Sequence, residues 1–393
     1  MYKSSLVLTV FFVSYVNVIH TATTKKDHVP GRSALDNFPL VDGHNDLPHN
    51  LYLKLNNTLK GFHFDKNLTG DAVFGSSDCS CHTDLQRLRK GKVGAQFWAA
   101  YVSCDSKSEN AVVRTLDQID VIKRLINRYN NDLELVTTAD GIIDAFNRKK
   151  IASLIGVEGG HSIGNRMSVL RLFYELGVRY LTLTHVCHLD WAESAEIDKT
   201  NSSTIGLTNF GKKIVLEMNR LGMLVDLSHV SYDVMKQAIS VSRAPVIFSH
   251  SSARAVYNHV RNVADDVLVK VKENGGIVMV NFYSGFIASA NATIRDVVNH
   301  INHIVDIAGI DHVGIGSDFD GVPDTPVGLE DVSKYPDLFD LLSELNPDRW
   351  TIKHLEKLAG RNFLRVFKEV EKIKESLISE PPAEDLLEIS NQV

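Results

Sequence analysis

The sequence predicts an α/β fold, a (β/α)8 barrel of the TIM type, and three observations lead to this prediction. Eight short apolar runs recur along the 393 residues, segments of helical periodicity separate them, and no Gly-x-Gly-x-x-Gly motif follows the first run. Alternating strands and helices are typical of a parallel sheet covered by helices. A doubly wound open sheet is the alternative, and the missing glycine motif removes the usual reason to prefer it.

The eight apolar runs are the predicted strands. Each is rich in Val, Ile and Leu with little polar alternation, which is the pattern of strands buried on both faces. The runs are 38–46, 93–102, 151–160, 178–185, 222–229, 244–250, 275–283 and 312–321.

Between the runs, apolar residues recur at spacings of three and four, which predicts helices. Several of these segments stop at a glycine, the usual residue just beyond a helix end. The clearest predicted helices are 112–129, 169–177, 209–222, 265–275 and 294–309. The long connections 48–92 and 186–208 are predicted to be loops over the strand ends.

The two ends of the chain are predicted to lie outside the barrel. Lys3 precedes an apolar run from Leu6 to Ile19 and then small residues, the layout of a secretory signal peptide. A signal anchor is the alternative, although the run is short for a membrane span. We expect a signal peptide at 1–22 with an approximate cleavage site, a single (β/α)8 domain at 36–375, and an extended or disordered tail at 376–393.

Several features predict a secreted or extracellular protein. No second apolar run reaches membrane-spanning length, and the acidic C-terminus lacks the hydrophobic tail of a lipid-anchor signal. A net charge of -6 without a dense basic stripe argues against nucleic-acid binding. Four Asn-x-Ser/Thr glycosylation sequons agree with secretion: Asn56, Asn67, Asn201 and Asn291.

Side chains that can bind a metal or transfer a proton follow the predicted strands. The carboxyl ends of barrel strands meet on one rim, where active sites lie. One such residue would more often be a loop cap, but seven at the same topological position predict a metal site. They are His44, Asp46, Glu158, His185, His229, His250 and Asp318.

These residue types indicate which metal binds. Imidazole and carboxylate without a nearby thiolate suit Zn²⁺ and tolerate Mn²⁺ or Co²⁺. A single catalytic zinc usually takes three protein ligands, so this set is too large for one ion. Two metals bridged by a carboxylate would use them all.

Six motifs carry a resemblance to a known family: VDGHNDLP, GVEGGH, YLTLTH, DLSH, FSHSSA followed by RN, and GSDFDG. Together they closely resemble the membrane (renal-type) dipeptidases of the binuclear zinc peptidase family, over about residues 38–370. The resemblance implies the same barrel, of the metal-dependent hydrolase type. It also implies that a hydroxide bridging two metal ions hydrolyses the peptide bond of a dipeptide substrate.

The resemblance implies two Zn²⁺ per chain. His44 and Asp46 would bind the first zinc, and His229 and His250 would bind the second. Glu158 would bridge the two ions.

The resemblance assigns three further residues to the substrate. His185 would contact it and polarise the scissile carbonyl, and Asp318 would shuttle the proton. Arg261 would grip the C-terminal carboxylate, since guanidinium matches carboxylate geometry. Arg243 and Arg254 are alternatives close in sequence.

The four cysteines suggest disulfides in an oxidising compartment. The resemblance implies a Cys104–Cys187 bridge. The family's usual C-terminal interchain cysteine and lipid-anchor signal are missing, which puts a covalent homodimer and a membrane anchor in doubt. Cys79 or Cys81 could link two chains instead, and a Cys-x-Cys metal site is a minor alternative.

The remaining polar and aromatic residues receive ordinary structural roles. Five loop histidines are expected to face solvent, and Asp226 and Ser228 to support the ligands. Asp320 shares the face of Asp318 and is expected either to support a ligand or to compete with Asp318 as one. Trp98, Trp191 and Phe282 are expected to pack the barrel or its loops. The loop histidines are His49, His63, His82, His161 and His188.

Two other functions remain open. One is a related amide or β-lactam hydrolase on the same barrel. The other is a catalytically inactive secreted binding protein, against which the presence of every proposed ligand argues.

Overall fold

A computed structural model of the chain describes residue 1 and residues 31–74, 81–105, 108–200 and 202–387. The predicted signal peptide beyond Met1, Cys79, the sequon at Asn201 and the last part of the predicted tail lie outside the described residues.

Parallel strands form the centre of the fold, and most of their positions are buried, with β3 the least enclosed. Burial on both faces explains why the strands read as continuous apolar runs. The strands are β1 (Leu40–Asn45), β2 (Val93–Tyr101), β3 (Leu133–Leu135), β4 (Ile151–Glu158), β5 (Val178–Thr182), β6 (Leu224–Asp226), β7 (Ile247–Phe248), β8 (Ile277–Val280) and β9 (Val313–Ile315).

Eight of these strands close a barrel in the order β1, β2, β4, β5, β6, β7, β8, β9. The ring closes because β1 pairs with β9 as well as β2, and β2 pairs with β4 from Ala95↔Ala152 to Tyr101↔Glu158. The predicted (β/α)8 fold is confirmed. The sequence prediction missed β3, which pairs with Ile151–Ser153 at the start of β4.

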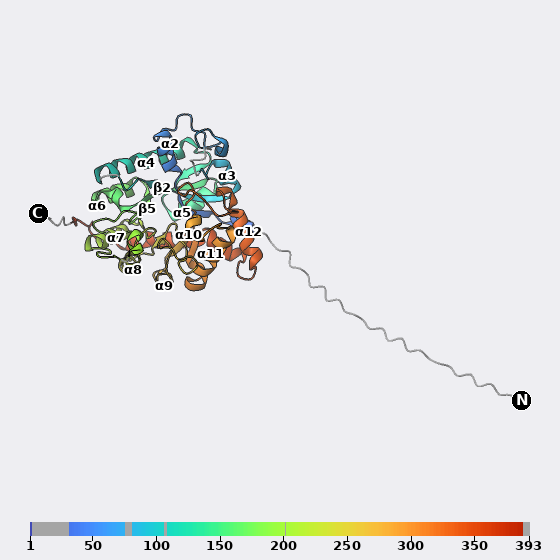
Figure 1. Cartoon of the computed structure of the whole chain (residues 1–393). Helices are drawn as coiled ribbons and strands as arrows, with labels where there is room; N and C mark the ends of the chain where they lie inside the picture. Colours follow the sequence, from blue (N-terminus) through green and yellow to red (C-terminus); the bar gives the residue numbers. More distant parts are fainter. Residues whose placement is uncertain (2–30, 75–80, 106–107, 201, 388–393) are drawn as a thin grey trace.

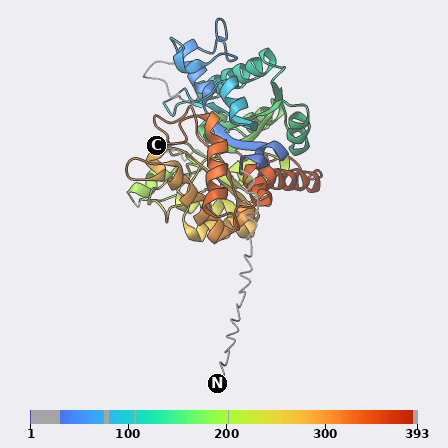
Figure 2. The same ribbon diagram turned by 90° about the vertical axis from the view of Figure 1, so that its right-hand side faces the viewer.

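Helices surround the barrel (Figures 1 and 2), and all five predicted helices are present. They correspond to α4, α6, α7, α9 and α11. The helices are α1 (Ala34–Asn37), α2 (Leu47–Leu55), α3 (Leu85–Lys90), α4 (Ser108–Arg128), α5 (Ala139–Asn147), α6 (Met167–Glu175), α7 (Asn209–Leu221), α8 (Tyr232–Val241), α9 (Asp265–Asn274), α10 (Ser284–Ile287), α11 (Ile294–Ala308), α12 (Tyr335–Leu345), α13 (Ile352–Glu356) and α14 (Asn362–Ser376).

The predicted loop 48–92 is partly wrong, because it contains α2 and α3. Pro48 lies in the first turn of α2, where its missing N–H costs nothing. Asp84 caps α3 by accepting a hydrogen bond from the backbone N–H of Arg87. These capping signals stand in a segment too short for helical periodicity to be clear.

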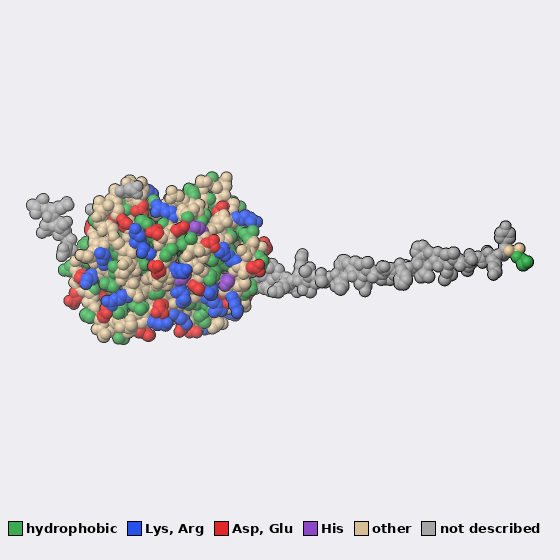
Figure 3. Space-filling view, turned by 90° about the horizontal axis from the view of Figure 1, so that it is seen from below, with side chains coloured by type: hydrophobic (Ala, Val, Ile, Leu, Met, Phe, Trp, Pro, Cys, Tyr) green, Lys and Arg blue, Asp and Glu red, His purple; other side chains and the backbone are tan. Residues whose placement is uncertain are grey.

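One cluster of the core fills the barrel itself. Phe97, Tyr180 and Met279 point into it, and Phe363 of α14 packs against the same cluster. A larger cluster lies between the strands and the surrounding helices. The molecular surface in Figure 3 shows acidic and basic side chains interspersed on the face it presents.

Residues 381–387 of the predicted tail form neither helix nor strand. Ala383 anchors them, because its N–H donates to Glu217 on α7 and its carbonyl accepts from Arg171 on α6. The described part of the tail is therefore held against the barrel's outer helices.

Candidate metal centre

The structure brings the predicted rim residues together at the carboxyl ends of the strands. They line or underlie a pocket of about 350 Å³. Five of them line the pocket, whereas the side chains of His44 and His250 are fully buried beneath it. The pocket-lining members are Asp46, Glu158, His185, His229 and Asp318.

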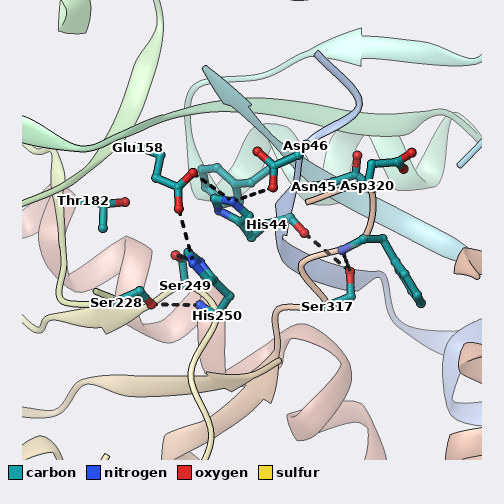
Figure 4. Close-up of polar contacts among 12 residues, drawn as sticks. His44, Asn45, Asp46, Glu158, Thr182, Ser228, Ser249, His250, Ser317 and Asp320 are labelled. Carbon is teal, nitrogen blue, oxygen red and sulfur yellow. Dashed lines mark hydrogen bonds and ion pairs between the residues drawn. The ribbon is translucent and has the colours of Figure 1, made fainter. Parts of the chain in front are cut away.

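Glu158 lies between two groups of ligand-type side chains (Figure 4). Its Oε2 is 3.6 Å from Nε2 of His44, which is itself 3.1 Å from Oδ2 of Asp46. Its Oε1 is 3.0 Å from Nε2 of His229 and 3.4 Å from Nε2 of His250. We call His44 and Asp46 the first half of the centre, and His229 and His250 the second half. Each oxygen of Glu158 therefore faces one half.

The donor atoms fit a metal. Nε2 of His44 and Oδ1 of Asp46 are buried without a hydrogen-bond partner, and Nε2 atoms of His229 and His250 face each other at 2.9 Å. Buried polar atoms without partners are costly, and a cation would satisfy them. Three sets of ligand atoms lie within 4.8 Å of one another: His44, Asp46 and Glu158; Glu158, His185 and His229; and His44, His250 and Asp318.

The protonation states of Glu158 and of the second half also suit a metal. Burial raises the pKa of Glu158, but nearby His44 and His185, together with the hydrogen bonds of His229 and His250, outweigh it and hold the pKa well below its usual value. Burial lowers the pKa of His229 and His250 well below that of free imidazole. An ionised carboxylate and neutral imidazoles are the forms that bind a metal.

His44 differs, because burial lowers its pKa but nearby Tyr180, Asp46 and Glu158 outweigh that effect and raise the pKa well above its usual value. A metal in the first half would therefore displace a proton from His44.

Asp318 differs from Glu158 in its electrostatic surroundings. Burial raises the pKa of Asp318 well above its usual value, and the nearby carboxylates of Asp46 and Glu158 raise it further. A carboxylate with a raised pKa is a stronger proton acceptor, which suits a group that takes a proton and later returns it.

The first half is supported from inside the barrel. The Tyr180 hydroxyl is hydrogen-bonded to Nδ1 of His44 at 2.8 Å, which leaves Nε2 facing Glu158. The buried carboxylate of Asp42 accepts from the N–H and hydroxyl of Ser317, at 2.8 and 2.7 Å. It also accepts from the Tyr335 hydroxyl at 2.6 Å. Because Ser317 directly precedes Asp318, the Asp42 contacts fix the strand end that carries Asp318.

The second half has a matching support. Asp226 accepts from the N–H and hydroxyl of Ser249, at 2.8 and 2.6 Å, and from the Thr182 hydroxyl at 2.6 Å. The Ser249 hydroxyl is also 2.8 Å from Nδ1 of His250. Since its single proton goes to Asp226, it accepts from the Nδ1–H of His250. This tautomer leaves Nε2 of His250 free for a metal.

Backbone geometry at the rim is unusual. His229, Asp318 and Asp320 have φ angles of 70°, 68° and 67°, in the left-handed region. Such residues cost about 1–3 kcal/mol each and cluster at functional sites. Gly316 allows the close approach below them, because a Cβ there would lie 1.8 Å from the Ser249 carbonyl oxygen.

Of the three candidate arginines, Arg261 reaches the pocket. It is 4% exposed, and its guanidinium donates to the carbonyl of His250 at 3.3 Å and lies 5.3 Å from the Phe286 ring centre. Its Nε makes no hydrogen bond. Arg243 instead pairs with Glu380 at the surface, and Arg254 is hydrogen-bonded to Asn258.

The prediction for the loop histidines is wrong in part. His63 and His188 are exposed, but His49, His82 and His161 are not. His49 lines the pocket, Nε2 of His161 bonds to the Val102 carbonyl at 2.9 Å, and burial lowers the pKa of His82 to about 4. These loops fold back over the strand ends, so their polar residues are enclosed.

Packing and disulfide expectations can be compared with the structure directly. Trp98, Trp191 and Phe282 are fully buried, which confirms their packing role. Cys104 and Cys187 form a disulfide with their Cα atoms 5.9 Å apart. Cys81 is also disulfide-bonded, and its suggested interchain link stays a prediction.

A closed parallel barrel with histidines and carboxylates at its rim defines a metal-dependent hydrolase. The family model for membrane dipeptidases (peptidase family M19) matches residues 31–380. The chain therefore belongs to this family of metallo-dipeptidases, which hydrolyse the peptide bond of dipeptides.

Known proteins of this kind are similar over most of the chain. An uncharacterized dipeptidase of Schizosaccharomyces pombe is 48% identical over 347 residues, covering 84% of this chain and 80% of the relative. Dipeptidase 3 of Mus musculus is 47% identical over 352 residues, covering 88% of this chain and 67% of the relative. A metallopeptidase structure from Rhodobacter sphaeroides, bound to a phosphinate mimic of L-Ala-D-Ala, is 26% identical with a TM-score of 0.74, covering 85% of this chain and 99% of that one.

Proposed function

We propose that this protein is a secreted dipeptidase that holds two Zn²⁺ ions and cleaves dipeptides with a hydroxide shared between them. The observation that carries the proposal is the position of Glu158. Its two oxygens face separate halves, at 3.6 Å from His44 and at 3.0 Å from His229. A carboxylate placed in this way can bridge two metal ions.

The chain's own residues supply the rest of the chemistry. Arg261 offers a buried guanidinium edge for the substrate's terminal carboxylate. His185 lines the pocket beside Glu158 and His229, where it can donate a hydrogen bond to the carbonyl oxygen as negative charge develops. Asp318 takes a proton from the attacking water and returns it to the leaving amine.

Secretion is supported by the apolar run 6–19 and by the Cys104–Cys187 disulfide, because disulfides persist in oxidising compartments. The sequon residues Asn56, Asn67 and Asn291 are exposed, as glycosylation requires. No helix in the described part of the chain is long and apolar enough to cross a membrane.

A substrate panel tests the proposal. Zinc-loaded protein should hydrolyse Ala-Gly. L-Ala-L-Ala and L-Ala-D-Ala should be compared as well, because the Rhodobacter sphaeroides relative binds a mimic of L-Ala-D-Ala. N-acetylalanine and a β-lactam test the alternative amide hydrolase. Preferential cleavage of either one over all dipeptides would overturn the proposal, and no cleavage of any would favour the inactive binding protein.

A further inference from the structure

A second cavity, of about 370 Å³, lies beside the catalytic pocket. His49 and Tyr101 line both cavities, and their rings meet edge to face with centres 4.7 Å apart. Nδ1 of His49 makes no hydrogen bond. The His49–Tyr101 ring pair therefore forms part of the wall between the two cavities, and no hydrogen bond at Nδ1 fixes the His49 ring in place.

The barrel places this wall opposite Arg261. Tyr101 ends β2, and Arg261 is bonded to the carbonyl of His250, which follows β7. In the eight-strand ring, β2 and β7 are four steps apart in either direction, so they lie on opposite sides. A dipeptide whose carboxylate lies on Arg261 therefore points its amino-terminal residue across the metal centre, toward Tyr101 and His49.

The second cavity has an apolar wall and one unsatisfied buried acceptor. Tyr52, Leu53 and Val102 line it together with Gln118 of α4. Gln118 is only 2% exposed. Its Nε2 donates to Oδ1 of Asn57 at 2.9 Å, but its Oε1 accepts no hydrogen bond among the described residues. A buried acceptor without a donor is costly, so the cavity suits a ligand that brings one.

The charged residues that line the second cavity favour neither a cationic nor an anionic ligand, because one is basic and one is acidic. Arg114 and Asp117 also line the cavity, and both are exposed. A ligand group with a long, uncharged stem and a hydrogen-bond donor at its tip fits this chemistry. Among amino-acid side chains, glutamine and tyrosine have that form.

We propose that the second cavity binds the side chain of the substrate's amino-terminal residue and favours glutamine and tyrosine there. This inference rests on the proposed dipeptidase function, because Arg261 must hold the other end of the substrate. The side chain enters past the His49–Tyr101 ring pair, and Gln118 accepts a hydrogen bond from its tip.

Paired substrates test the cavity in the zinc-loaded wild-type protein. We expect kcat/KM for Gln-Gly to exceed that for Met-Gly, and Tyr-Gly to exceed Phe-Gly, each by about fivefold, the effect of one net hydrogen bond. Ratios of one or less, with Ala-Gly still hydrolysed, would overturn the cavity assignment alone. Failure to hydrolyse Ala-Gly would instead overturn the proposed function.

Two variants locate the effect. Gln118→Met removes the acceptor at similar volume and should bring both ratios close to one. Ser103 also lines the cavity, so Ser103→Phe should fill it and raise KM for Gln-Gly and Tyr-Gly more than for Ala-Gly. Val113→Phe, at a 58% exposed position of the same helix outside the cavity lining, is the matched control and should keep the wild-type ratios. Wild-type ratios in a folded Gln118→Met protein would contradict the proposal.

Discussion

The two halves of the candidate metal centre rest on matching aspartates but differ in what those aspartates hold. Asp42 on β1 binds Ser317, which precedes Asp318, whereas Asp226 on β6 binds Ser249, which precedes His250. Both aspartates are fully buried and accept from the N–H and hydroxyl of a serine that follows another strand.

The difference lies in the last contact. The Ser249 hydroxyl also reaches Nδ1 of the proposed ligand His250, at 2.8 Å. The Ser317 hydroxyl contacts the backbone carbonyl of His44, at 3.4 Å, and the imidazole of His44 is held separately by Tyr180. The same aspartate–serine hydrogen bonding therefore orients a metal ligand in the second half and positions the proton-transfer group Asp318 in the first.

The largest effect is expected where the two halves meet. Glu158→Gln removes the negative charge that both halves share and replaces the metal-binding oxygen of one half with an amide nitrogen, so zinc binding and activity should fall together. The loss in kcat/KM should exceed the roughly 10–100-fold that supporting residues cost. Zinc content by mass spectrometry and Ala-Gly hydrolysis measure it.

Glu193→Gln is the control for Glu158→Gln. Glu193 is also buried, but it accepts from the backbone of Thr204 and Ile205 in a loop. This variant should keep its zinc. A Glu158→Gln protein that kept two zinc ions and full activity would refute the shared carboxylate.

The next effect separates the two aspartates. Asp226→Asn should weaken zinc binding by about 10–100-fold, because it disturbs the hydroxyl that orients His250. Asp42→Asn should lower kcat with a smaller change in zinc affinity, because Asp42 holds Ser317 beside Asp318 and touches His44 only through its backbone N–H, at 3.3 Å. Competition with a chelator gives the affinities, and equal losses of affinity in the two variants would show that the two supports do the same work.

Single hydroxyl deletions should have smaller effects. Tyr180→Phe removes the partner of His44, and Ser249→Ala removes the partner of His250. Each should reduce zinc affinity by about tenfold, and Ser249→Ala more than Tyr180→Phe because it also loses the bond to Asp226. The same chelator titration ranks them, with melting of the metal-free proteins as the folding control.

The smallest effect on zinc is expected at Asp320, near the first half. Burial raises the pKa of Asp320 to about 7, while its Oδ1 accepts from Asn50 and from the His82 N–H. A carboxyl pKa higher in the folded than in the unfolded protein means that stability falls as pH rises from about 4 to about 7. Asp320→Asn should remove this loss of folding stability, because an amide does not ionise.

Thermal melting of the metal-free proteins tests this sign. The variant should match the wild type at pH 4 and exceed it at pH 8, by at most about 4 kcal/mol. A variant less stable than the wild type at pH 8 would show that the charged form of Asp320 is stabilising.

The strand ends could be read from the sequence because buried parallel strands leave continuous apolar runs. Each proposed ligand stands at the end of such a run, so the barrel brings His44 and His250 together although 206 positions separate them. Helices with strong periodicity, such as α11, were predicted equally well.

The supporting contacts could not be predicted in the same way. Tyr180 reads as one more core residue of β5, and its role depends on a hydroxyl contact with β1, 136 positions away. The sequence did contain a signal. A serine directly precedes both His250 and Asp318, and Asp42 and Asp226 stand shortly before His44 and His229. Pairing these residues required knowing which strands lie together.

The central claim is that Glu158 is shared between two metal ions, and zinc stoichiometry tests it most directly. Chelator-stripped wild-type protein should be titrated with Zn²⁺ while heat and Ala-Gly hydrolysis are followed. The account predicts saturation at two zinc ions per chain, with full activity only at the second equivalent. Saturation and full activity at one zinc ion per chain would contradict it.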